Sequence, residues 1–157
     1  GGYTLELINP EHPCQGPSNW SASNNSNGGT PGSVNSLYDN TPDIDGASID
    51  KINIISNNEI QVVFSESMDT TTVTTNTTNW SCSGSLQVSS DGFTTCVKMY
   101  AKPTASNSNT TFTLRPYENL SKTTNYKIRV TPESKSSKGN TFSSQYTSPN
   151  GFLTASL

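Results

Sequence analysis

Few residues in this 157-residue chain could carry out acid–base or nucleophilic chemistry. His12 is the only histidine, and it stands between Glu11 and Pro13. A catalytic histidine needs a positioned nucleophile and an acid that orients the ring, and no spacing in the sequence identifies either group. A zinc site would need more ligands than His12 and Cys14 supply. We therefore expect no catalytic site and no enzyme activity.

Three aspartates, Asp43, Asp45 and Asp50, are close enough in sequence to supply oxygen ligands to calcium. An EF-hand loop also needs a glycine at its sixth position and a bidentate glutamate at its twelfth, and this stretch has neither. Two interpretations stay open: a calcium-stabilised joint between domains, and a solvated acidic linker, which is favoured. No other cofactor is indicated. Glu66 and Asp69 are expected to cap a turn rather than to bind a cation.

Two of the three cysteines, Cys82 and Cys96, stand near the ends of expected strands, and we predict a disulfide between them. A tight turn at 91–92 would leave Cys82 roughly 17 Å away along its strand. Bonded cysteines need Cα atoms within about 7 Å, so the disulfide requires a wider arch over residues 89–93. Two buried free thiols are the alternative. Cys14 is the odd cysteine and is expected to be free.

The two tryptophans are candidates for contact with a ligand. An exposed tryptophan on a loop can stack on a sugar or anchor a protein partner. Trp20 lies in a polar, proline-rich stretch and is expected to dock from a loop. Trp80 lies just before Cys82, so packing at the edge of the core is the alternative for this side chain.

The elements that must position these side chains are clearest between Phe112 and Thr131. Apolar and polar residues alternate there in two runs, which is typical of strands with one face toward a core. Leu120 lies six residues before Tyr126, a spacing that favours a tyrosine corner, in which the phenol hydroxyl bonds back to the preceding chain. An ordinary hairpin with a buried tyrosine is the alternative.

Similar alternation predicts short strands throughout the region from residue 44 onward, with Phe64 facing the core and Asn57-Asn58 as a two-residue turn. The expected strands lie at 49–54, 60–64, 86–88, 97–99, 112–114, 126–131 and 152–154. This pattern predicts an all-β fold, an antiparallel β-sandwich of about seven strands.

The first 43 residues are expected to be a separate part of the chain. Tyr3, Leu5 and Leu7 alternate with polar residues and predict one extra N-terminal strand. Residues 9–43 are rich in Pro, Gly, Asn and Ser, which indicates a long loop or linker. Because so long a loop is unusual inside a compact domain, we place a domain boundary between residues 43 and 44.

Charge and hydropathy exclude some partners. A net charge of −3 and a pI of about 5.0 provide no basic footprint for nucleic acid. No run of 18 apolar residues exists, so no membrane-spanning segment is expected.

Two resemblances to known families add to these expectations. Four blocks resemble the bacterial Ig-like domain of S-layer and other surface proteins: IQVVFSESMD (60–69), TTNYKIRVT (123–131), SKGN (137–140) and GFLT (151–154). The variant with Cys82 and Cys96 is similar to copies in leptospiral surface proteins. The resemblance implies an Ig-like domain over 44–157. It also implies a non-catalytic adhesion module or spacer in a protein that is secreted or exposed at the cell surface, on the outer membrane.

Within residues 1–43, the blocks LELINP (5–10), SNW (18–20) and GGTPGSVNS (28–36) resemble the closing segment of bacterial lamin-tail-like domains. This resemblance implies that residues 3–8 are the last strand of a truncated Ig-like sandwich. Because an unpaired apolar strand invites augmentation, we expect it to pair with the Ig-like domain or with a neighbouring chain.

The sequence thus favours a surface module whose partner is a protein or a glycan. The competing hypothesis is an accessory module of a secreted multidomain enzyme, and the third is the calcium-stabilised joint.

Overall fold

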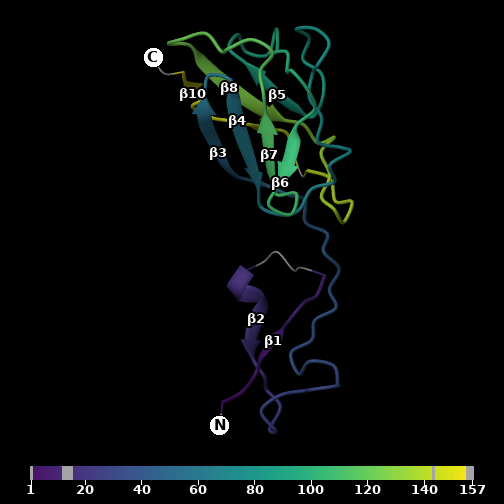
Figure 1. Ribbon diagram of the computed structural model, residues 1–157. Coiled ribbons are helices and arrows are strands. Elements are labelled where there is room, and N and C mark those ends of the chain that lie inside the picture. Colours follow the sequence, from purple (N-terminus) through teal and green to yellow (C-terminus); the bar gives the residue numbers. More distant parts are fainter. Residues whose placement is uncertain (1, 12–15, 143, 155–157) are drawn as a thin grey trace. The chain divides into compact units, whose positions relative to one another are not determined.

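The computed structural model describes residues 2–11, 16–142 and 144–154, and the chain divides into two compact units, Gly1–Ile44 and Asp45–Leu157 (Figure 1). The strands are β1 (Leu5–Leu7), β2 (Trp20–Ala22), β3 (Ile49–Ser56), β4 (Glu59–Phe64), β5 (Leu86–Ser89), β6 (Thr104–Ser106), β7 (Thr111–Leu114), β8 (Asn125–Val130), β9 (Tyr146–Thr147) and β10 (Phe152–Leu153). A 3-10 helix, η1 (Gly16–Asn19), precedes β2. His12 and Cys14 lie outside the described residues.

In the N-terminal unit, β1 pairs antiparallel with β2, so that Leu5 lies opposite Ala22 and Leu7 opposite Trp20. This pairing occupies one edge of β1, and pairing of its other edge with the Ig-like domain or with a neighbouring chain stays a prediction. The presence of β2 corrects the expectation of one continuous loop over 9–43. Three residues are too few to show alternation, which is why the sequence did not indicate β2.

A buried carboxylate holds the loop of this unit against β1. Glu6 is 5% exposed; its carboxylate accepts hydrogen bonds from Thr30 Oγ1 at 2.5 Å, Ser36 N–H at 2.8 Å and Ser36 Oγ at 2.7 Å. The Thr30 hydroxyl is the main cause that lowers the pKa of Glu6 to about 2, against the opposing effect of burial. The loop therefore buries the charged side chain of Glu6, whereas all three residues of β2 are exposed and Leu5, on the other face of β1, is 69% exposed.

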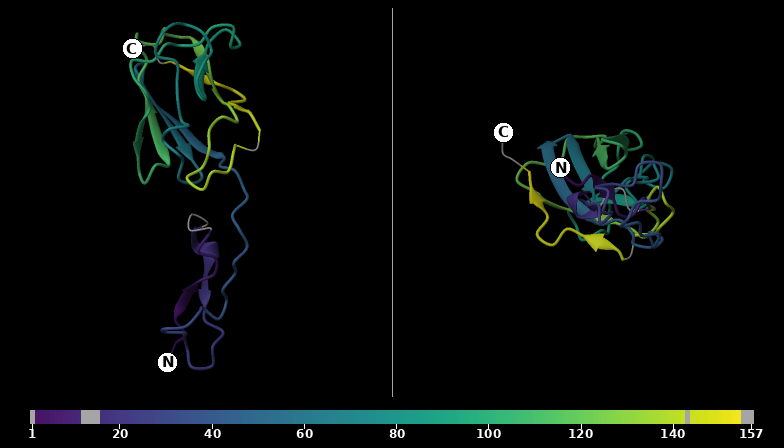
Figure 2. Two further views of the ribbon diagram at one scale, coloured as in Figure 1. Left: turned by 90° about the vertical axis from the view of Figure 1, so that its right-hand side faces the viewer. Right: turned by 90° about the horizontal axis from the view of Figure 1, so that it is seen from below.

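The second unit consists of two antiparallel sheets that face each other (Figures 1 and 2). One sheet has the strand order β3-β4-β7-β6, and the other places β8 between β5 and the consecutive segments β9 and β10. Asn57 and Asn58 form the predicted two-residue turn, since Ser56 lies opposite Glu59.

The apolar core lies between the two sheets, because alternate side chains of each strand point inward. Phe64 is 1% exposed and meets Phe112 and Phe142 edge to face, with ring centroids 5.6 and 6.1 Å apart. The other core side chains that are less than 2% exposed are Ile60, Val62, Met68, Val73, Leu86, Val88, Met99, Leu114, Ile128 and Val130. Both sheets contribute to this set, and burial of each such side chain stabilises the fold by about 1.5–3 kcal/mol.

Tyr126 and Leu120 lie at the edge of this core, 6% and 4% exposed. The Tyr126 hydroxyl accepts a hydrogen bond from the backbone N–H of Ser121 at 3.1 Å, five residues upstream. Its ring stacks on Phe152 of β10 at a centroid distance of 5.9 Å. This is the geometry of a tyrosine corner, which fixes the chain as it enters β8.

The expected strand at 97–99 is wrong. Val97 N–H donates to Val88 O at 2.7 Å, whereas Met99 N–H donates to Asn76 O at 2.8 Å and Met99 forms only an isolated bridge with Pro116. Residues 97–99 therefore form hydrogen bonds with different segments of the chain and do not form a strand ladder with any one of them. The edge strand next to β7 is β6 instead.

The expected strand at 152–154 forms as β10, and β9 is a further short strand that the sequence pattern did not predict. β9 and β10 both pair with β8, and they are separated by residues 148–151. Gly151 has a φ of 66°, and a Cβ there would collide with the carbonyl oxygen of Tyr126. The interruption includes Pro149, so the ladder cannot run unbroken along this edge.

Candidate interaction surfaces

The disulfide between Cys82 and Cys96 is formed, with Cα atoms 4.8 Å apart. Because Val97 pairs with Val88, the chain between them forms the wide arch that the disulfide requires, not a two-residue turn. Cys96 N–H also donates to Trp80 O at 2.9 Å, so the disulfide ties the arch to the loop that carries Trp80.

The Asp91 side chain holds the arch together through hydrogen bonds to other residues of the same loop. Its carboxylate accepts hydrogen bonds from Thr95 Oγ1 at 2.6 Å, Ser89 Oγ at 2.8 Å and the backbone N–H groups of Thr94 and Thr95. The Thr95 hydroxyl, followed by the Thr95 amide and Ser89, lowers the pKa of Asp91 to about 2. The carboxylate is therefore engaged in holding its own loop.

Arg129 packs against the arch on the outer side of β5 and β8. Its Nε donates to Gln87 Oε1 at 2.8 Å, and its guanidinium lies 4.1 Å from the centroid of the Phe93 ring. Gln87 Nε2 in turn donates to Gly84 O at 2.8 Å. This contact between a cation and an aromatic face fixes the arch over the sheet.

The two tryptophans are each about half exposed, 49% for Trp20 and 47% for Trp80. Trp20 lies in β2 and not in a loop, which corrects its expected setting. Trp80 lies in a loop held by buried Asn76, whose Nδ2 donates to Ser81 O at 2.8 Å. A role of Trp20 or Trp80 in ligand contact stays a prediction.

The acidic candidates are dispersed. Within residues 2–11, 16–142 and 144–154, no three His, Cys, Asp or Glu side chains group closely enough to hold a metal ion. A calcium site at Asp43, Asp45 and Asp50 therefore stays a hypothesis from the sequence. Asp69 caps its turn as expected: its Oδ1 accepts from Thr71 Oγ1 at 2.7 Å and Thr71 N–H at 2.9 Å, which lowers the pKa of Asp69.

One exposed surface was missed by sequence reasoning. Tyr100 and Tyr117 are 72% and 53% exposed, and they lie on two adjacent segments that also carry Lys98 and Arg115. We call these four residues the tyrosine–cation surface. A sequence signal was present: a cation two positions before a tyrosine occurs in both segments, as Lys98-Met-Tyr and Arg115-Pro-Tyr.

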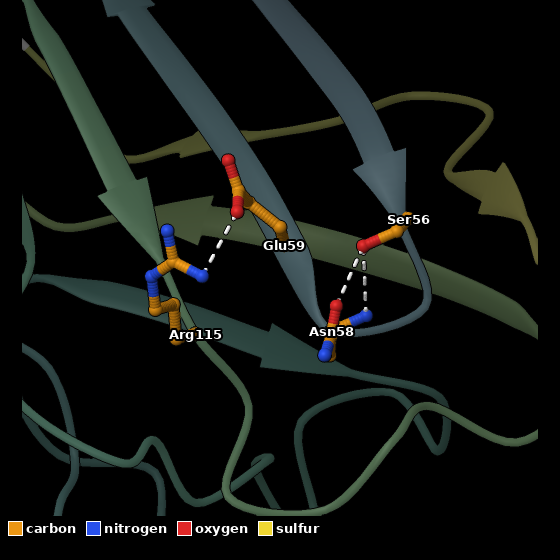
Figure 3. A network of polar contacts seen from close by, with 4 residues as sticks. All are labelled: Ser56, Asn58, Glu59 and Arg115. Atoms are coloured by element: carbon orange, nitrogen blue, oxygen red, sulfur yellow. Dashed lines mark hydrogen bonds and ion pairs between the residues drawn. The ribbon is translucent and has the colours of Figure 1, made fainter.

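The Arg115 side chain extends back across the sheet toward β4. Its Nη1 lies 2.9 Å from Glu59 Oε2, beside the β3–β4 turn where Ser56 Oγ donates to Asn58 Oδ1 at 2.7 Å (Figure 3). The Arg115 side chain is 58% exposed and that of Glu59 is 23% exposed. This exposed ion pair contributes little to stability, but it orients the guanidinium.

An open groove of about 290 Å³ lies between β3 and the segment that carries β9 and β10. It is lined by Ile49, Asp50, Lys51, Ile52, Tyr146, Ser148, Pro149, Asn150 and Gly151. The described part of the chain contains no helix long and apolar enough to cross a membrane.

Two facing antiparallel sheets with a tyrosine corner define an Ig-like β-sandwich. The model of the bacterial Ig-like domain matches residues 40–154, and the chain belongs to this family.

Solved structures of the S-layer protein SbsC share the fold. The N-terminal part of the bacterial S-layer protein SbsC is 18% identical, covers 64% of this chain and 22% of its own, and has a TM-score of 0.52. The S-layer protein rSbsC(31-844) is 18% identical, covers 64% of this chain and 13% of its own, and has a TM-score of 0.50. The chain thus spans less than a quarter of either protein. Curated protein sequences gave no match.

Proposed function

We propose that this chain is a non-catalytic module of an exported bacterial surface protein, in which it acts as a spacer and presents a binding surface. The observation that carries the proposal is membership of the bacterial Ig-like domain family together with an apolar core built from described residues of the second unit. A module with its own core keeps its shape while residues on its outer faces vary, as a spacer or adhesive domain requires.

The chemistry of the carboxylates supports a non-enzymatic role. Glu6, Asp69 and Asp91 each accept hydrogen bonds from hydroxyl and amide groups of nearby loops, and the pKa of each is lowered. A general acid or base near neutral pH needs the opposite shift. These three groups therefore stabilise loops.

The disulfide supports export, because such bonds persist in oxidising compartments and are rare in a reducing cytosol. The proposed location is the outside of the cell, exposed on the outer membrane, with a protein or glycan as partner. We also propose that the N-terminal unit is the closing segment of a lamin-tail-like domain.

Protease treatment of intact source cells tests the location. We expect the module to be cleaved, or labelled by an antibody to residues 45–157, while a cytoplasmic marker protein stays intact. Full protection in intact cells with cleavage after lysis would contradict surface exposure.

A binding screen of the purified chain against matrix proteins and glycans tests the adhesive part of the role. We expect at least one specific partner, and Trp20→Ala reports whether the exposed tryptophan of β2 contributes. If no partner binds while the module is surface-exposed, the spacer role alone stands.

A further inference from the structure

We propose that the tyrosine–cation surface binds an acidic polysaccharide, with a sugar ring stacked on Tyr100 and the acidic group held by Arg115 and Lys98. The proposal adds a partner class to the surface role above, but the surface exists whether or not the module is exported.

The geometry begins with an isolated antiparallel bridge. Met99 lies opposite Pro116, and the flanking backbone hydrogen bonds join Tyr100 N–H to Arg115 O at 2.8 Å and Tyr117 N–H to Lys98 O at 2.9 Å. Met99 is fully buried and Pro116 is also buried. Because side chains alternate between faces, the four flanking side chains share the opposite, outward face.

In the register of this bridge, each cation of one segment lies opposite a tyrosine of the other segment. Lys98 lies opposite Tyr117, and its Nζ is 4.1 Å from the ring centroid. Arg115 lies opposite Tyr100, the most exposed aromatic side chain of the described residues at 72%. Each segment thus presents one ring and one positive charge side by side.

The cations are oriented before any ligand arrives. The Tyr117 ring holds the Lys98 ammonium, and Glu59 holds one nitrogen of the Arg115 guanidinium at 2.9 Å. A guanidinium has five N–H donors, so a carboxylate or sulfate can still be bound by the others. Side chains that are already oriented lose less entropy on binding.

The chemistry favours a sugar acid over other partners. An exposed tyrosine ring offers a flat apolar face to the C–H face of a pyranose, and its hydroxyl offers a hydrogen bond. The two cations complement a carboxylate or sulfate on that sugar. Single-stranded nucleic acid also stacks on aromatic rings, but it needs a basic groove that follows its backbone, whereas this surface supplies one pair of cations, Lys98 and Arg115.

The test is titration calorimetry of the whole chain in low salt with four probes: oligogalacturonate, chondroitin sulfate oligosaccharide, methyl-esterified oligogalacturonate and oligo(dT). We expect one or both acidic oligosaccharides to bind and the neutral ester to bind at least about tenfold more weakly, a difference of about 1.4 kcal/mol. The first two probes distinguish a carboxylate ligand from a sulfate ligand.

Variants locate the site. Tyr100→Ala and Arg115→Gln are each expected to weaken binding at least about tenfold, whereas the matched exposed changes Tyr38→Ala and Lys51→Gln leave it unchanged. Circular dichroism confirms that each variant is folded. Failure of both acidic probes to bind, equal binding of the ester, tighter binding of oligo(dT), or binding unaffected by Tyr100→Ala and Arg115→Gln would overturn the proposal. None of these results bears on surface exposure, which the protease experiment measures separately.

Discussion

Hydroxyl side chains determine the state of the carboxylates in this protein. Thr30, Thr71 and Thr95 each donate a side-chain hydrogen bond to Glu6, Asp69 and Asp91 respectively, and in each case this bond is the first cause of the lowered pKa. Hydrogen bonds to the ionised form favour it. An abundance of serine and threonine thus has a structural use: it fixes loops around acidic residues where apolar side chains are scarce.

The first prediction concerns the titration of Glu6. Its pKa in the folded chain is about 2, below the ordinary 4.5. The stabilisation from its ionised form is therefore present above about pH 4.5 and declines as the pH falls toward 2. Carbon-detected NMR should place the Glu6 midpoint near 2, and Thr30→Val should raise it. A Glu6 midpoint near 4.5 in the unchanged protein would refute the buried arrangement.

The second prediction concerns the tyrosine corner. Tyr126→Phe removes the hydrogen bond from Ser121 N–H but keeps the stacking on Phe152. We expect the free energy of unfolding to fall by about 1–2 kcal/mol, because a backbone N–H loses its partner. Urea unfolding measures the change. Tyr100→Phe, at a 72% exposed position, is the matched control and should have no effect.

At the scale of elements, two kinds of interaction hold the arch, which is the loop from the end of β5 to residue 97. The disulfide joins its base to the loop that carries Trp80, and Asp91 holds its interior through hydrogen bonds. Neither constraint depends on a strand ladder. The arch can therefore keep its shape although it contains no regular secondary structure.

The third prediction concerns the disulfide. Replacement of Cys82 and Cys96 by alanine, in a Cys14→Ala background, should lower the free energy of unfolding by about 3 kcal/mol, because the unfolded chain gains loop entropy. Urea unfolding of the oxidised background protein is the reference. If reduction of that protein leaves its unfolding midpoint unchanged, the disulfide does not constrain the domain.

The fourth prediction separates backbone strain from steric conflict at the interruption between β9 and β10. Gly92→Ala and Gly151→Ala both place a side chain at a positive φ, 73° and 66°, which costs roughly 1–2 kcal/mol. Only at Gly151 would the new Cβ meet the Tyr126 carbonyl, whereas at Gly92 it meets open space. We expect Gly151→Ala to destabilise the domain clearly more in thermal unfolding. Equal losses would mean that β10 can shift without cost.

At the scale of the whole molecule, the two units are stabilised in different ways. Every residue of the apolar core cluster belongs to the second unit, from Ala47 onward. The described part of the first unit instead buries polar groups, among them Glu6, Asn9 and Asn19. Asn9 N–H donates to Asn19 Oδ1, and Asn19 Nδ2 donates back to Asn9 O.

The fifth prediction follows from this difference. Residues 45–157 expressed alone should fold and unfold cooperatively, with a melting temperature within about 2 °C of that of the second unit in the whole chain. Calorimetry of the two proteins provides the comparison. A fragment that fails to fold would show that the second unit depends on the first.

The sequence by itself determined the elements whose signal is local. Alternation identified the strands around 49–54, 60–64, 86–88, 112–114 and 126–131, and burial of Phe64, Leu114 and Ile128 agrees with it. The Leu120–Tyr126 spacing indicated the corner, and the distance along the strand between Cys82 and Cys96 indicated the arch. Each of these depends only on the period of a strand and on short-range geometry.

Only the tertiary structure decided which segments lie side by side. Strands of two or three residues, such as β2, β6 and β9, carry no period, so their pairing comes from partners distant in sequence. The burial of Glu6 depends on Thr30 and Ser36, more than twenty positions away. The tyrosine–cation surface exists only because Lys98-Met-Tyr and Arg115-Pro-Tyr meet across one bridge. A sequence pattern shows which side of a strand is apolar, but the neighbour across the sheet is set by long-range packing.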